Sequence, residues 1–146
     1  MKMKKLICVM ALVCIGMLLV SCGSNRLGDP KAQLMRDFGL HIDKKDCVLE
    51  ELFNNYEGVP YEGIALYKLT IGEDVRQAFL QWERFPFSEE AECFLESLSA
   101  YAELPSIADG YWKMVDRNPG TSAYTNVSLC VYDRATDAAY LLTMDI

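Results

Sequence analysis

The sequence predicts an α+β fold: a single domain whose antiparallel sheet ends in a three-strand C-terminal meander, with helices packed on one face. Residues 126–132 alternate two sets of side chains with a period of two, which is typical of a strand. Two stretches between residues 73 and 101 repeat apolar residues at helical spacing. Short polar links join the last three expected strands, and such links favour antiparallel neighbours.

The first expected helix begins at Asp29-Pro30, where the aspartate can cap the helix and the proline suits its first position. Leu34 and Phe38 belong to its apolar stripe, and Gly39 is suited to its end. Residues 46–53 fit a strand or a helical turn by periodicity. We interpret them as a strand because a turn-rich segment and a clear strand follow.

The turn-rich segment is Asn54–Gly63, which contains Tyr-Glu-Gly twice, with Pro60 between the two copies. Glycine and proline at this density indicate a loop. Residues 64–71 then alternate in the manner of a strand.

Two helices are expected next. Glu73 and Asp74 suit a helix N-terminus, and Ser88 suits the N-cap of the second helix. Phe85-Pro86-Phe87 separates the two helices, and Pro105 ends the second. The apolar residues at helical spacing are Val75, Ala78, Phe79 and Trp82 in the first helix, and Ala91, Phe94, Leu95, Leu98 and Tyr101 in the second.

The C-terminal meander is expected to consist of strands at 111–117, 126–132 and 138–146. Asn118-Pro119-Gly120 between the first two suits a type II turn, with proline at its second and glycine at its third position. The polar residues 133–137 connect the last two strands.

The first residues have the organisation of an export signal. Three lysines among the first five residues precede an apolar run at 6–20 that ends in small residues. The tetrapeptide Leu19-Val20-Ser21-Cys22 resembles the lipobox of bacterial lipoproteins, in which the cysteine becomes the first residue of the mature chain. This resemblance implies that Cys22 carries a diacylglycerol thioether, and often a third acyl chain such as palmitate. Two or more such chains hold a protein stably on a bilayer.

This interpretation divides the chain into a lipoprotein signal peptide at 1–21, a lipidated tether at 22–28 and a single α+β domain at 29–146. As a helix, the apolar run would extend about 22 Å, less than the ~30 Å hydrocarbon core, so a cleaved signal is favoured over a permanent transmembrane helix. We expect the domain to be held on the cell membrane or envelope, outside the cytoplasm.

The charge of the expected domain limits its partners. Three of the 14 basic residues precede Cys22 and all 21 acidic residues follow it, so the segment from Cys22 onward has 11 basic residues and a net charge of −10. This charge argues against a nucleic-acid partner and permits a cationic one.

The sequence contains no pattern that points to zinc binding or to catalysis by cysteine or histidine. Beyond Cys22 the sequence contains Cys47, Cys93 and Cys130, whose spacing fits no zinc pattern. We expect Cys93 and Cys130 to be buried, and whether two of the three form a disulfide stays open. The single histidine, His41, is expected at the surface, because no serine or cysteine context suggests that it activates a nucleophile.

The acidic residues offer candidate carboxylate pairs for acid–base chemistry, namely Glu50, Glu51, Glu57, Glu62, Asp116 and Asp133. An acidic chain contains many such pairs, so they are weak evidence for an enzyme. Glu57 and Glu62 could also bind Ca²⁺, although the loop lacks the dense carboxylate spacing of known calcium loops. We expect no catalytic residue, no metal and no cofactor.

The loop Asn54–Gly63 is the candidate partner-binding segment. Its two tyrosines lie outside the strand and helix stripes, next to acids, and exposed aromatic residues are common in protein contacts. The candidate residues are Tyr56, Glu57, Tyr61 and Glu62. The alternative is an ordinary loop whose tyrosines pack back onto the domain.

Residues 46–146 resemble a group of small exported bacterial proteins that have no assigned function. The resemblance is carried by Trp82 with Phe85-Pro86-Phe87, by Asp109-Gly110-Tyr111-Trp112, and by the run from Asn126 to Asp133. It implies the fold and no activity. In that group the loop before the second strand is rich in Gly, His and Asp, whereas Asn54–Gly63 has no histidine.

The sequence therefore predicts a membrane-anchored lipoprotein with a small acidic, non-enzymatic domain that binds or accompanies another envelope or extracellular protein. One alternative is an inhibitor or immunity-type protein that acts against a basic target. A second alternative is a carboxylate-based hydrolase that acts on wall or glycan material.

Overall fold

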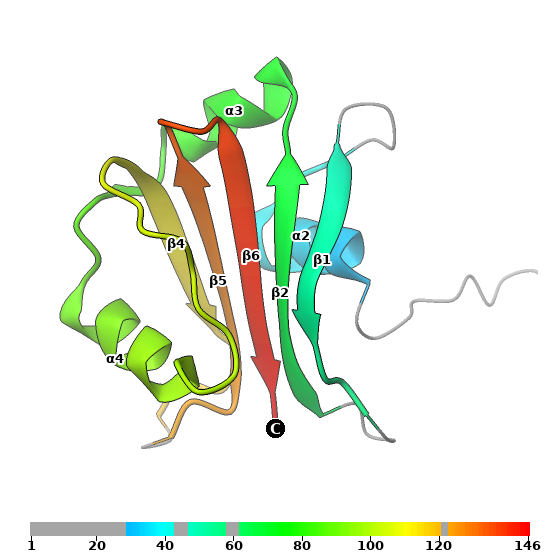
Figure 1. Cartoon of the computed structure of the whole chain (residues 1–146), viewed down its shortest axis with the longest axis vertical. Coiled ribbons are helices and arrows are strands. Elements are labelled where there is room, and N and C mark those ends of the chain that lie inside the picture. Colours follow the sequence, from blue (N-terminus) through cyan, green and yellow to red (C-terminus); the bar gives the residue numbers. More distant parts are fainter. Residues whose placement is uncertain (1–28, 43–46, 58–61, 121–122) are drawn as a thin grey trace, which may run out of the picture.

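The computed structural model describes residues 29–42, 47–57, 62–120 and 123–146 of the chain. Its six strands form one antiparallel sheet in the order β1-β2-β6-β5-β4-β3, so the α+β fold class is confirmed (Figure 1). In chain order the described elements are α2 (Pro30–Phe38), β1 (Val48–Asn54), β2 (Gly63–Thr70), α3 (Glu73–Phe79), β3 (Glu83–Arg84), α4 (Glu89–Leu98), β4 (Gly110–Asp116), β5 (Asn126–Asp133) and β6 (Ala138–Asp145).

The C-terminal meander is confirmed, because β5 pairs with β4 on one side and with β6 on the other, both antiparallel. The structure adds that β6 also pairs with β2 along its whole length, from Gly63 opposite Asp145 to Thr70 opposite Ala138. The last strand of the chain therefore lies in the centre of the sheet.

The helices lie on both faces of the sheet, which corrects the expectation that they pack on one face. In Figure 1, α2 lies behind the sheet and α4 in front of it. Both faces of the central strands are apolar: on β6, Leu141 belongs to one core and Leu142 to the other. All residues of β6 from Ala138 to Met144 are buried, as in a strand that is covered on both sides.

Each face has its own core. The core on the α2 and α3 side contains Leu34, Phe38, Val75, Phe79, Tyr67, Leu69, Cys130 and Leu141. The core on the α4 side contains Phe94, Leu98, Ile64, Leu66, Trp112, Leu129, Leu142 and Met144.

Three helix ends follow local sequence signals, whereas α4 ends at Leu98, before Tyr101 and well before Pro105. The Asp29 side chain accepts a hydrogen bond from the Lys31 amide at 3.0 Å, and Ser88 Oγ accepts one from the Ala91 amide at 3.2 Å. Gly39 ends α2 in the left-handed conformation with φ of 69°. The two-residue strand β3 was not predicted, because a strand this short has no periodicity.

Candidate functional site

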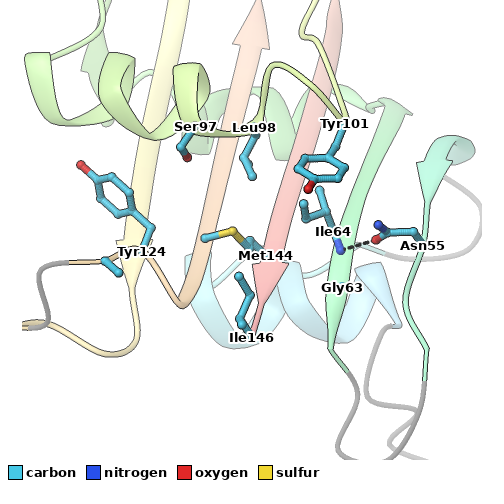
Figure 2. A pocket seen from close by; sticks show the side chains of 10 residues that line it. Asn55, Gly63, Ile64, Ser97, Leu98, Tyr101, Tyr124, Met144 and Ile146 are labelled. Carbon is cyan, nitrogen blue, oxygen red and sulfur yellow. Dashed lines mark hydrogen bonds between the residues drawn. The ribbon is translucent and has the colours of Figure 1, made fainter.

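A pocket of about 480 Å³ opens on the α4 side of the sheet, where α4 lies against the ends of β2 and β6 (Figure 2). Ile64, Leu98 and Met144 are buried side chains in its wall. Tyr101 and Tyr124 flank these residues on opposite sides in Figure 2. The described residues that line the pocket are Asn55, Gly63, Ile64, Ser97, Leu98, Tyr101, Ala123, Tyr124, Met144 and Ile146.

The secondary structure accounts for this lining. In α4, Phe94 and Leu98 are one turn apart and face the sheet, and Tyr101 follows three residues later. Ile64 on β2 and Met144 on β6 are paired across the sheet, so their side chains lie on the same face. The pocket remains open because α4 ends at Leu98 and Tyr101 is 55% exposed.

Three polar side chains around the pocket form hydrogen bonds within the domain. Asn55 accepts a hydrogen bond from the Ile64 amide at 2.7 Å, and Ser97 Oγ donates one to the Phe94 carbonyl at 2.6 Å. The Tyr124 hydroxyl donates to the Glu90 carbonyl at 3.1 Å. The pocket therefore offers mainly apolar contact and carries no charged residue in its described lining.

Acidic residues border the pocket. Glu57 and Glu62 pair across a short antiparallel bridge just beyond Asn55 and Ile64, with backbone hydrogen bonds of 3.0 and 3.3 Å in the two directions. Tyr56 points to the opposite face, where its hydroxyl meets Thr143. Because side chains alternate along a strand, Glu57 and Glu62 project on the face that carries the pocket.

The far side of the pocket is also acidic. Partial burial and the nearby groups of Cys93, Glu90 and Asp116 raise the pKa of Tyr124. The four acids of α4, namely Glu89, Glu90, Glu92 and Glu96, are exposed, and the helix contains no lysine or arginine.

A second pocket, of about 490 Å³, lies on the same face near Glu50, Lys68, Glu103 and Tyr140. Here Glu50 stands opposite Lys68 in the β1–β2 register. The lining of this second pocket therefore includes charged side chains of both signs, whereas the described lining of the first pocket includes none.

On the other face of the sheet, a polar network joins α2 to the strands. The Asp37 side chain is 3% exposed and accepts hydrogen bonds from Arg117 at 2.7 Å, Ser128 at 2.7 Å and Arg36 at 2.8 Å. Arg117 also bonds to Asp145. Burial alone would raise the pKa of Asp37, but the hydrogen bonds from Arg36 and Ser128 and the charge of Arg117 outweigh it and lower the pKa.

Tyr56 belongs to this network. Its hydroxyl donates to Asp145 Oδ2 at 2.7 Å and lies 3.1 Å from Thr143 Oγ1. Burial is the main reason that the pKa of Tyr56 is raised. The side chain thus packs back onto the domain, which was the alternative interpretation of the loop.

The other residues proposed for partner binding are placed as follows. Glu57 and Glu62 are exposed beside the pocket. Tyr61 lies outside the described residues, as do the lipobox and its Cys22. Sequence reasoning missed Tyr101 because its spacing fitted the apolar stripe of the second helix, and it missed Tyr124 because this residue lies between two expected strands, outside any periodic pattern.

The histidine and the cysteines considered for catalysis do not form a common site in the described structure. His41 is exposed, as expected. Cys130 is buried, but Cys93 is exposed, which corrects the prediction that it is buried: the buried stripe of α4 runs through Ala91, Phe94 and Leu98. Cys47, Cys93 and Cys130 are free thiols in the described structure. Burial raises the pKa of both Cys47 and Cys130, which disfavours the nucleophilic thiolate.

Three of the candidate carboxylates, namely Asp133, Asp116 and Glu51, accept local hydrogen bonds. Asp133 accepts from the Ala135 amide at 3.0 Å and from Thr136 Oγ1 at 2.6 Å, which fixes the β5–β6 turn. Asp116 accepts from the Asn118 amide at 2.8 Å, and Glu51 from Asn54 Nδ2 at 2.9 Å. Within the described ranges, no group of three or more His, Cys, Asp or Glu side chains has the arrangement of a metal site.

Of the helices that the structure describes, none combines the length and the apolar character required to cross a bilayer.

The comparisons with family models, with curated proteins and with solved structures found no match to this chain.

Proposed function

We propose that this protein is a lipid-anchored, non-enzymatic domain, held outside the cytoplasm, that binds another envelope or extracellular protein. The observation that carries the proposal is the open pocket, in which Ile64, Leu98 and Met144 are flanked by Tyr101 and Tyr124. Aromatic and methionine side chains are enriched in protein interfaces. A solvent-facing apolar hollow of this kind is typical of a recognition site.

The distribution of polar groups supports binding over catalysis. The carboxylates of Asp37 and Asp145 are both engaged by Arg117. Around the pocket, Asn55 and Ser97 are engaged in internal hydrogen bonds. A catalytic group must instead be within reach of a substrate and have a matched pKa.

Replacing Cys22 with Ala tests the anchor. We expect the wild-type protein in the membrane fraction and the Cys22→Ala variant unprocessed or released, because the variant cannot form the thioether. Cys93→Ala is the matched control, since Cys93 is exposed in the folded domain and should leave fractionation unchanged. A Cys22→Ala variant that stays processed and membrane-bound would refute the anchor.

Affinity capture with the full chain tests the binding role. We expect one envelope or secreted protein at stoichiometric yield, which Tyr101→Ala reduces and Leu80→Ala does not. Tyr101 and Leu80 are both exposed apolar residues, at 55% and 42%, but only Tyr101 lines the pocket. Absence of a stoichiometric protein partner would contradict the proposal.

A second candidate function, an inhibitor of a basic target, is favoured by the exposed acids of α4 and by the net charge of the chain. Electrostatic steering would then make the association rate fall steeply as salt is added. A complex whose association rate does not depend on salt would count against this candidate.

A further inference from the structure

We propose that the pocket receives an apolar side chain from a cationic segment of the partner protein, and that lysine or arginine residues beside that side chain contact Glu57 and Glu62. This inference rests on the proposed function and adds the chemistry of the partner. It is based on the lining of the pocket, on the pairing of the two glutamates and on the charge around them.

The lining of the pocket favours an apolar side chain of the partner. Ile64, Leu98 and Met144 are no more than 7% exposed and form an apolar wall. The volume of about 480 Å³ exceeds that of packing defects and lies within the usual range of binding pockets. Asn55 Oδ1 and Ser97 Oγ already take part in internal hydrogen bonds, so burying an apolar side chain here leaves these two groups paired.

The glutamate pair supplies the charge. Glu57 and Glu62 stand directly opposite each other in the bridge, and like charges in this position destabilise a sheet. In the same β1–β2 ribbon, Glu50 stands opposite Lys68, an oppositely charged pair. No described lysine or arginine forms an ion pair with Glu57 or Glu62, so a cation from a partner would relieve their repulsion.

The distance between the pocket and the two glutamates suits one short segment of the partner protein. Glu57 is two residues beyond Asn55, and Glu62 is two residues before Ile64, both of which line the pocket. Two residues of a strand extend about 7 Å. An extended partner segment would therefore place an apolar side chain in the pocket and a basic side chain two residues away beside the glutamates.

The other side of the pocket repeats the charge pattern. Glu90 lies beside Tyr124, because the Tyr124 hydroxyl donates a hydrogen bond to the backbone carbonyl of Glu90. Asp116 is close enough to raise the pKa of the same tyrosine. Acidic groups thus border the pocket on two sides, and a segment with basic residues on both sides of its apolar residue fits better than a neutral apolar ligand or a second copy of this acidic chain.

A peptide selection tests this chemistry. The full chain is held in phosphatidylcholine nanodiscs, and empty nanodiscs are the control. The probe is a bead-displayed library of random octapeptides. We expect enrichment of peptides with a central aliphatic or aromatic residue flanked by lysine or arginine. Enrichment of acidic peptides, of apolar peptides without basic residues, or of no peptide would overturn the inference.

Variants then locate the binding site of an enriched peptide. We expect Glu57→Gln with Glu62→Gln to weaken binding about fivefold at low salt, because exposed ion pairs contribute modestly. We expect Tyr101→Ala to weaken it roughly tenfold, as for an interface aromatic residue. The matched control is Asp74→Asn with Glu83→Gln, which removes two exposed charges away from the pocket and should leave affinity unchanged.

The outcomes separate this inference from the proposed function. If the chain captures a stoichiometric protein partner whose affinity neither set of variants changes, the inference fails and the proposed function stands. If no protein partner is captured and no peptide is enriched, both fail. Self-association of the chain that Tyr101→Ala abolishes would assign the pocket to a second copy and would also overturn the inference.

Discussion

Replacing Asp37 with Asn should destabilise the domain without changing its fold. Asp37 is 3% exposed and is the shared acceptor of Arg117 and Ser128, so the variant removes the charge that balances Arg117. Removing one partner of a buried ion pair costs about 3–5 kcal/mol. Arg117 retains its ion pair with Asp145, and its side chain is 20% exposed. We therefore expect a smaller loss in the free energy of unfolding, about 2–3 kcal/mol.

Urea unfolding followed by tryptophan fluorescence measures this loss, and thermal unfolding should show a Tm lower by roughly 10 °C for a domain of this size. Asp74→Asn is the matched control, because it removes the same charge from an exposed side chain. We expect it to change the free energy of unfolding by less than about 0.5 kcal/mol. Equal stability of wild type and Asp37→Asn would refute the role of the network.

The pH dependence gives a second test of the same carboxylate. The pKa of Asp37 in the folded state lies below its ordinary value of 3.8, so its contribution to stability is complete above that value. It is lost as the pH falls through the folded pKa. The stability difference between wild type and Asp37→Asn should therefore be largest near neutral pH and disappear on strong acidification. A difference that is constant with pH would show that another property of the variant is responsible.

Three further predictions concern packing and exposure. Phe94→Ala should lower the free energy of unfolding by about 3–5 kcal/mol in a urea titration, since Phe94 is fully buried, and a loss below 1 kcal/mol would contradict its place in the core. Gly110→Ala should reduce the yield of folded protein measured by gel filtration, because the added Cβ would overlap the carbonyl oxygen of Tyr132; normal yield and stability would contradict this close approach. Among the cysteines of the folded domain, iodoacetamide should modify Cys93 much faster than Cys130 when followed by mass spectrometry, and equal rates would contradict their burial.

Local signals in the sequence predicted much of the fold. The Asp29 and Ser88 caps act within three residues, and the alternation of the last strands depends on neighbouring side chains, so both are legible without tertiary structure. The sequence did not predict that helices cover both faces of the sheet. Apolar residues at successive positions, such as Leu141 and Leu142, fit a strand but do not indicate whether one or both faces of the sheet are covered.

The site was predicted only in part. In the acidic loop, Glu57 and Glu62 lie beside the pocket and their predicted role in partner binding stays a prediction, whereas Tyr56 turns to the other face and bonds to Asp145, 89 residues away. Arg117 and Asp37 are 80 residues apart, so their contact depends on the topology of the sheet. The pocket has the same origin, since α4, β2 and β6 meet there only in the folded domain.

Photo-crosslinking in living cells tests the central claim that this pocket binds a partner protein. A benzoylphenylalanine residue is introduced at Tyr101 in the full chain, and at Leu80 as the control position of similar exposure outside the pocket. Irradiation should join position 101, and not position 80, to one envelope or secreted protein. An absence of adducts at position 101, or the same adducts at both positions, would contradict the account.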